Sequence, residues 1–145
     1  MLTETSAKKR PFHVVLAEDD REMRIVLAQA LHKSGYHVTE CSDGLGLLDQ
    51  LGSWLYARDV GPEEAETQAI DVVISDVRMP GVNGLSILEG IQGQPGIPAV
   101  ILITAFGDKA THEQAHRWGA KAVFDKPFDV DDLLQSVHDI VSPPL

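Results

Sequence analysis

The chain has 145 residues, of which 43% are hydrophobic, and its formal net charge at pH 7 is −10. This length suits one globular domain that can bury most of its apolar surface without disulfides. The negative charge argues against direct nucleic-acid binding, because phosphate contacts need a basic face, and it suits cations and basic partners instead.

Signals for export or membrane insertion are not found in the sequence. Lys8, Lys9 and Arg10 form a basic cluster, but no apolar core follows it as in a signal peptide. The longest apolar run, residues 99–103, is far too short to span a bilayer. A single cysteine, Cys41, allows no internal disulfide and fits a reducing compartment. We therefore expect a cytoplasmic protein that does not enter a membrane.

The first part of the chain predicts two strand–helix pairs after a disordered lead-in over residues 1–11. Residues 13–17 (HVVLA) indicate a buried strand, and three acids follow it directly. A helical stripe begins at Arg21, and residues 36–41 alternate as a half-exposed strand does. A second helix is expected from 43–44 onward. Its apolar side carries Leu47, Leu48, Leu51 and Leu55.

An unusual acidic segment, GPEEAETQ at 61–68, separates this helix from the next strand. It has no apolar periodicity, so we expect a solvated loop or an extension of the helix. We interpret it as part of an insertion near 52–69, which is a passive surface loop or, as the alternative, a contact for a partner.

Three further strand–helix pairs complete the pattern. The strands are expected at 71–76, 99–103 and 122–125, and the helices from Asn83, Asp108 and Asp129. Five strands alternating with helices predict βαβ units and a parallel sheet with both faces covered, which is an α/β fold.

Polar residues stand where four of the predicted strands end: Glu18 with Asp19, Asp76, Thr104 and Lys126. In a parallel sheet these ends meet at one edge, where open α/β sheets bind ligands. Alone, Asp76 could equally cap a turn. Three carboxylates drawn together need a cation, and Mg²⁺ prefers carboxylate, water and phosphate oxygens. A carboxylate can also attack a phosphoryl group, and a lysine and a threonine can hold its oxygens.

These motifs together resemble the receiver domain of two-component response regulators, over about residues 13–141. The segments that carry the resemblance are Glu18-Asp19, SDVRMPGVNG around Asp76, Thr104-Ala105 and Lys126-Pro127-Phe128. The resemblance implies a flavodoxin-like, doubly wound sheet with strand order 2-1-3-4-5 in a receiver domain spanning 12–141. Residues 142–145 would be a tail or the start of a linker. The RMPG turn is similar to that of NtrC-type regulators.

The resemblance also implies a phosphorylation site and a magnesium site. Asp76 would accept the phosphoryl group from a phosphohistidine on a sensor histidine kinase or a histidine phosphotransfer protein. Asp19 and Asp76 would bind Mg²⁺ (or Mn²⁺) directly, with the backbone carbonyl of Arg78, and Glu18 would assist through a water.

The remaining implied roles concern switching. Thr104, Ala105 and Lys126 would hold the phosphoryl oxygens, and the bond before Pro127 would be cis. The family's fourth helix, fifth strand and fifth helix would form the output surface, for an output domain, a partner protein or a homodimer. Such a domain assists its own phosphorylation and dephosphorylation but is a switch, not a turnover enzyme.

The chain departs from the family pattern in one place besides the 52–69 insertion. Val123 stands where the family has Tyr or Phe, and Phe124 should face the other side of the strand. Arg78 and Phe106 each follow a site residue by two positions and flank the expected path of attacking water. We expect them to slow the loss of phosphate.

Three other functions compete with the receiver interpretation. His112-Glu113-Gln114-Ala115-His116 is a literal HExxH, the signature of zinc metalloproteases, although such motifs often match by chance. A haloacid dehalogenase-type hydrolase needs an acid two residues after Asp76, where this chain has Arg78. A flavin module would share the fold, but the acids at 18–20 would repel a flavin phosphate.

Overall fold

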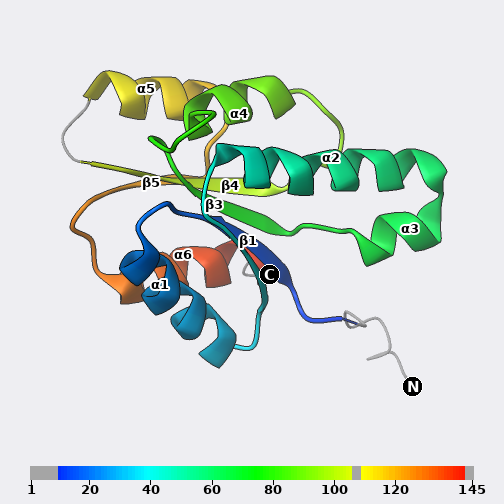
Figure 1. Cartoon of the computed structure of the whole chain (residues 1–145), viewed down its shortest axis with the longest axis horizontal. Coiled ribbons are helices and arrows are strands. Elements are labelled where there is room, and N and C mark those ends of the chain that lie inside the picture. Colours follow the sequence, from blue (N-terminus) through cyan, green and yellow to red (C-terminus); the bar gives the residue numbers. More distant parts are fainter. Residues whose placement is uncertain (1–9, 106–108, 143–145) are drawn as a thin grey trace.

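The computed structural model describes residues 10–105 and 109–142, which form a five-stranded parallel sheet with helices on both faces (Figure 1). The strands are β1 (His13–Ala17), β2 (His37–Cys41), β3 (Val72–Asp76), β4 (Ala99–Thr104) and β5 (Ala122–Asp125). The helices are α1 (Arg21–Lys33), α2 (Gly44–Val60), α3 (Pro62–Thr67), α4 (Gly84–Ile91), α5 (Lys109–Arg117) and α6 (Val130–Val141). The strand order β2-β1-β3-β4-β5 confirms the predicted flavodoxin-like fold.

Some predicted features lie outside the described residues. They include most of the lead-in before Pro11, the helix start at Asp108 and most of the tail after residue 141. Among the helices of the described ranges, none is long and apolar enough to cross a membrane.

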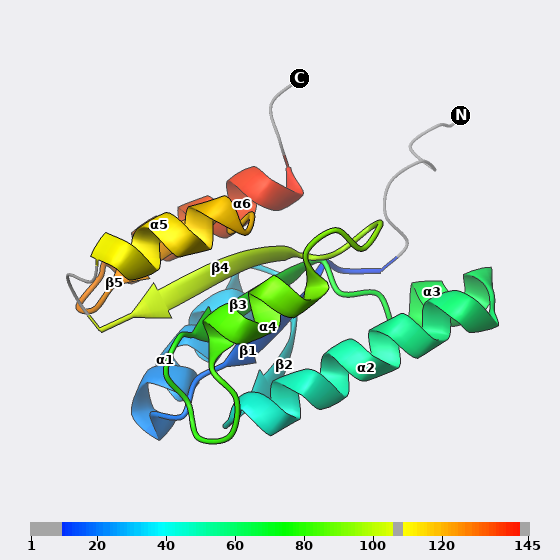
Figure 2. The same ribbon diagram turned by 90° about the horizontal axis from the view of Figure 1, so that it is seen from above.

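Two apolar cores lie on opposite faces of the sheet. Helices α2, α4 and α5 cover one face, and α1 and α6 cover the other (Figure 1 and Figure 2). Successive residues of β1 alternate between them, since Val15 packs into the first core and Val14 and Leu16 into the second. Because both faces are covered, β3 is buried along its whole length, which accounts for its unbroken apolar run.

Side-chain caps start three helices at the positions that the sequence predicts. The Asn83 side chain accepts hydrogen bonds from the backbone N–H groups of Leu85 and Ser86 at the start of α4. Asp43 caps α2 and Asp129 caps α6 in the same way. Each cap satisfies donors that the first turn of a helix leaves unpaired. The helices therefore start at defined positions close to the loops that leave the sheet.

The acidic segment 61–68 is not the surface loop that we expected. Helix α2 continues to Val60, and a separate short helix, α3, follows it. Pro62 at the first position needs no hydrogen-bond partner for its nitrogen, and Glu63 and Glu64 lie in the first turn, where the helix dipole favours negative charge. The segment is helical, as the alternative prediction had it, but it forms a separate helix and does not extend α2.

Arg10 joins this helical segment to the start of the sheet. Its guanidinium forms ion pairs with Glu66 of α3, at 2.8 Å, and with Asp71 just before β3, at 2.9 Å. The 61–68 segment is thus held at both ends, by α2 before it and by the ion pairs of Arg10 after it.

The apolar side of α2 also differs from the prediction. Leu47, Leu51 and Trp54 face the sheet and are buried. Leu48 and Leu55, expected on the same side, lie at its edge and keep 41% and 38% of their surface exposed. The long α2 therefore carries an apolar row in addition to the one that packs on the sheet.

Close packing between α2 and the loop after β3 makes a first prediction. A Cβ atom added at Gly44 would overlap the carbonyl oxygen of Val82 and lie 2.7 Å from the backbone nitrogen of Val82. Gly44→Ala should therefore lower the free energy of unfolding by about 1–3 kcal/mol, as overpacking does, measured by urea denaturation. The matched control is Gly52→Ala in the middle of the same helix, where an added Cβ meets nothing within 4 Å.

Gly52→Ala should leave stability unchanged or raise it by up to about 1 kcal/mol, since alanine favours helix more than glycine does. Equal stability of the two variants would show that the Gly44–Val82 contact can relax freely, against this prediction.

Candidate functional site

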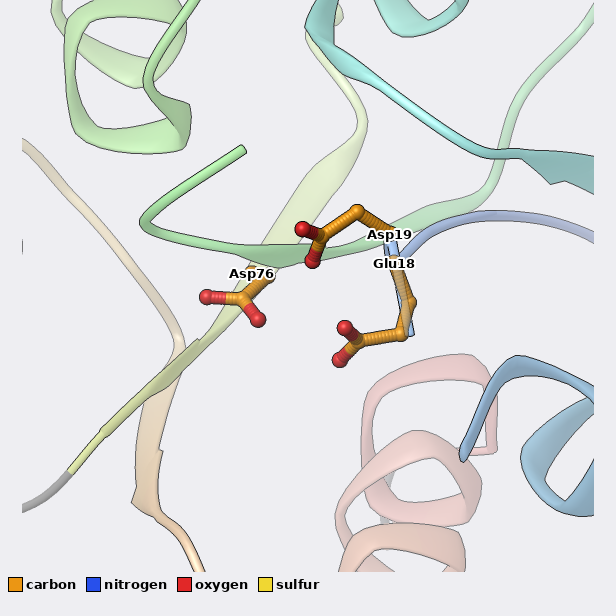
Figure 3. A group of neighbouring side chains, drawn as sticks. All are labelled: Glu18, Asp19 and Asp76. Atoms are coloured by element: carbon orange, nitrogen blue, oxygen red, sulfur yellow. The ribbon is translucent and has the colours of Figure 1, made fainter. Parts of the chain in front are cut away.

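Three acidic side chains meet at the carboxyl edge of the sheet. Glu18 and Asp19 follow β1, and Asp76 is the last residue of the neighbouring strand β3. Figure 3 shows their carboxylates around a common space, and one oxygen from each lies within 4.8 Å of the others. The predicted convergence of these residues is therefore present in the structure, at the point where the strand order reverses.

Lys126, which follows β5, is the cation closest to this group among the ion pairs of the described residues. Its ammonium nitrogen lies 2.7 Å from Oδ2 of Asp76 and 3.1 Å from Oε1 of Glu18. Burial opposes the charge of Lys126, but the two carboxylates outweigh it and raise the pKa of the lysine. The peptide bond between Lys126 and Pro127 is cis. One ammonium group therefore serves two carboxylates.

The second oxygen of Asp76 is held by the backbone. Oδ1 accepts a hydrogen bond from the backbone N–H of Arg78 at 3.0 Å. The side chain of Arg78 takes no part in this bond and is exposed to solvent. Asp76 is itself 5% exposed. The carboxylate is thus oriented on both sides, by Lys126 and by the turn that follows β3.

Thr104 lies at the end of β4, between Asp76 and Lys126 in the order of the sheet. It is buried, and its carbonyl accepts a hydrogen bond from the backbone N–H of Lys126 at 2.8 Å. Ala105 follows it and is exposed, whereas Phe106 lies outside the described residues.

Glu18 is the most constrained member of the acidic group. Its side chain is fully buried, and its Oε2 accepts a hydrogen bond from the N–H of Asp20 at 3.0 Å. Oε1 forms no hydrogen bond with the described residues, although the ammonium of Lys126 is near. Burial, together with the negative charge of Asp76, raises the pKa of Glu18.

This geometry fits a divalent cation. A buried carboxylate oxygen whose near partner is an ammonium shared with Asp76, beside two more carboxylates, is an environment that a further cation stabilises. Hard cations such as Mg²⁺ prefer such all-oxygen sites, and Mn²⁺ accepts the same donors. The acidic group of Glu18, Asp19 and Asp76 could therefore hold the expected metal ion.

Two contacts at the site could not be predicted from the sequence. Arg24 of α1 donates to the backbone carbonyl of Glu18 at 2.7 Å, and nothing in its helical position signals this. Gly84 packs so closely that an added Cβ would lie 2.6 Å from the carbonyl oxygen of Asp76. The Asn83-Gly84 pair in the sequence indicates only a helix start.

The position of Val123 agrees with the expectation for the strand before Lys126. Val123 packs into the core beneath α2, α4 and α5, whereas Phe124 packs into the opposite core, with its ring 5.9 Å from that of Phe128. No aromatic side chain of β5 therefore lies on the α5 side of the sheet.

The HExxH motif on α5 does not form a comparable cluster. His112 pairs through Nε2 with a carboxylate oxygen of Asp125 at 2.8 Å. Within the described residues, the group of three or more metal-ligating side chains is Glu18, Asp19 and Asp76, and it contains neither His112 nor His116. The zinc protease alternative has no third ligand there and finds no support.

The family model and similar curated proteins point to the same protein family. The family model of the response regulator receiver domain matches residues 14–138. The DNA-binding transcriptional regulator NtrC of Klebsiella pneumoniae is 32% identical over 127 residues, which are 88% of this chain and 24% of that protein. The C4-dicarboxylate transport transcriptional regulatory protein DctD of Pseudomonas aeruginosa is 36% identical over 125 residues, 86% of this chain and 24% of that protein. The chain thus spans about a quarter of the length of these relatives.

Solved structures show the same fold. The crystal structure of a putative response regulator from Chloroflexus aurantiacus has a TM-score of 0.74 to this chain at 23% sequence identity. The match covers 92% of this chain and 99% of that one.

The burial of Glu18 predicts a metal-dependent stability. A raised folded-state pKa means that stability is fully present below the ordinary value of 4.5 and is lost as the pH rises through the folded-state pKa. Near neutral pH without metal, Glu18 is therefore a net cost to folding. Glu18→Gln should raise the melting temperature in EDTA and reduce the further increase on adding Mg²⁺, measured by calorimetry.

The matched control is Glu22→Gln, which neutralises an exposed acid in the first turn of α1. It should change the melting temperature little and leave the effect of Mg²⁺ intact, because an exposed charge at a helix start contributes about 0.3–1 kcal/mol. A Glu18→Gln protein less stable than the parent in EDTA would contradict this account.

Proposed function

Because the chain belongs to the family of response regulator receiver domains of two-component signalling, we propose that Asp76 accepts a phosphoryl group in a Mg²⁺-dependent reaction. The donor is a phosphohistidine on a sensor histidine kinase or a histidine phosphotransfer protein. The observation that carries the proposal is the convergence of three carboxylates and Lys126 at the end of β3.

The metal ligands in this proposal come from three segments. Asp19 and Asp76 bind Mg²⁺ (or Mn²⁺) through carboxylate oxygens, the backbone carbonyl of Arg78 adds a ligand, and Glu18 acts through a water. The ion, when bound, offsets negative charge that builds up on the transferred phosphoryl group. Glu18, with an oxygen that lacks a hydrogen bond, supports this assignment.

In the transfer, an oxygen of Asp76 forms a bond to phosphorus while the bond from phosphorus to the histidine nitrogen breaks. The product is an acyl phosphate on Asp76, and the donor imidazole takes up a proton as it leaves. The ammonium of Lys126 already lies 2.7 Å from Asp76, so it can form an ion pair with the phosphoryl oxygens once they are attached to Asp76. The Thr104 hydroxyl and the backbone N–H of Ala105 complete the set of donors.

The output surface proposed for the switch is α5, β5 and α6. These are the family's fourth helix, fifth strand and fifth helix, because α3 is additional here. Phosphorylation would draw Thr104 toward Asp76 and shift the loop that leads to α5. With Val123 in place of the usual aromatic residue, α5 would couple to the site through Thr104 without a ring rotation.

The partner of this surface is an output domain, a separate protein or a second copy of the chain. NtrC and DctD are named as transcriptional regulators, so a transcriptional output is one form that this signalling could take. In each case the partner must bind the two states with different affinity, since a ligand with equal affinity shifts nothing.

The direct test of the site is phosphorylation by acetyl phosphate. With Mg²⁺, intact mass spectrometry should show a single alkali-labile phosphoryl adduct, which is absent without the metal and in Asp76→Asn. The matched control is Asp125→Asn, which removes an exposed acid from the end of β5 and should still be phosphorylated. Labelling of Asp76→Asn to the same extent would move the site elsewhere.

A second test concerns the lifetime of the phosphoryl group. Arg78 and Phe106 are proposed to obstruct the attacking water, so Arg78→Ala and Phe106→Ala should each shorten the half-life of the phosphorylated protein. We expect an effect of about tenfold, equivalent to about 1.4 kcal/mol in the barrier to hydrolysis, measured from the decay of the adduct. Decay at the parent rate in both variants would remove these residues from the proposal.

A further inference from the structure

Helix α2 carries an apolar row beside the side that packs on the sheet. Leu45 is 63% exposed, Leu48 41%, Leu55 38% and Tyr56 73%. The intervals between these successive residues are three, seven and one, which places all four on one side of a helix. The sheet-facing side of α2 is already complete without them, because Leu47, Leu51 and Trp54 fill it. The row is therefore surplus to the core of the domain.

Two hollows flank this row. One, of about 320 Å³, lies between α2 and α4 and is bordered by Leu55, Val82 and Ile87. The other, of about 920 Å³, lies between α2 and α3 and is bordered by Tyr56 and Glu64. Leu48 and Gly52 border both hollows, so the two form one continuous surface.

Gly52 lies in the middle of this surface and, because it has no side chain, leaves a depression there. A Cβ atom added there would meet nothing within 4 Å, so the space above the helix backbone is open. Side chains of another helix can enter such a gap, as ridges enter grooves in helix packing. With 17 residues, α2 is long enough to contact a helix of about four turns.

The charge of the region limits what can bind there. Residues 44–68 contain five acidic residues and one basic residue. Asp49 and Glu64 border the larger hollow directly. The one basic residue, Arg58, lies over the ring of Trp54 at 4.8 Å and does not border either hollow. A ligand that is apolar on one side and basic beside it would match this pattern.

Other occupants match less well. A second copy of the chain would bring the same acidic residues against themselves, in a molecule whose net charge is −10, and like charges facing each other oppose association. Nucleic acid is disfavoured by the same charge.

We propose that the surface formed by α2, α3 and the adjoining side of α4 is a docking site for an amphipathic helix of a partner protein. The apolar stripe of that helix contacts Leu45, Leu48 and Tyr56, and its Lys or Arg residues face Asp49 and Glu64. This is the mode in which an apolar helix face lies in a groove. The site lies at the opposite end of this helical layer from α5, with α4 between them (Figure 2).

The test uses a synthetic, fluorescein-labelled helical peptide of about 18 residues with a leucine stripe flanked by lysines. Fluorescence anisotropy should show saturable binding to the intact chain. The amide signals that shift in ¹⁵N NMR spectra should belong to α2 and α3. A peptide with the same leucines but with glutamate in place of lysine should bind at least roughly tenfold more weakly.

Two variants of the chain make the test specific. The double variant Leu45→Ser/Leu48→Ser should bind the lysine peptide at least roughly tenfold more weakly. Glu64→Lys should lower the affinity for the lysine peptide and raise the affinity for the glutamate peptide. Val26→Ser on α1, where Val26 is 50% exposed, is the matched control and should bind as the parent does. Circular dichroism checks that each variant is folded.

Three outcomes of the peptide experiments would overturn the proposal. They are equal binding of both peptides, unchanged binding by the Leu45/Leu48 variant, and shifts confined to other elements. A chain that sediments as a dimer and becomes monomeric in that variant would also overturn it, because the occupant would then be a second copy.

Discussion

Electrostatic repulsion among Glu18, Asp19 and Asp76 is the constraint on which the rest of the site depends. One ammonium group, that of Lys126, lies near two of the carboxylates, and burial makes the charge of Glu18 still less favourable. A protein selected for stability alone would gain by replacing one of these acids. The three acids could hold a further cation, and in the proposed function Asp76 becomes reactive when this cation and a phosphoryl donor are both present.

The parallel sheet is what brings these residues together. In the order β2-β1-β3-β4-β5, the ends of β1 and β3 are neighbours, and β4 and β5 follow on the same side. Residues more than a hundred positions apart therefore meet at one edge without any direct sequence contact. The backbone supports this arrangement, since Arg24 holds the carbonyl of Glu18 and Gly84 lets α4 approach the end of β3. The acidic group is thus positioned partly by residues that lie outside it.

Much of this could be predicted from short-range patterns. Apolar runs and side-chain caps predicted the strands and several helix starts, and the polar strand ends predicted the acidic group, because a parallel sheet leaves them one place to meet. The contact of Arg24 depends on how α1 sits on the sheet, which periodicity does not specify. That α3 is a separate helix was missed because it has no apolar stripe and is held by Arg10, a long-range contact. The exposure of Leu48 was missed for a related reason, since leucines at helical spacing do not reveal which of two rows packs on the sheet.

The structure thus gives this chain two faces with different chemistry: an acidic edge suited to a cation, and an apolar, acidic-rimmed surface along α2. The central claim concerns the first of these. It is tested most directly by anomalous diffraction from a crystal of the protein soaked in Mn²⁺. The account predicts one strong peak among the carboxylates of Glu18, Asp19 and Asp76, in direct contact with Asp19 and Asp76, and its loss in Asp19→Asn. Manganese bound elsewhere with this site empty, or an undiminished peak in Asp19→Asn, would contradict it.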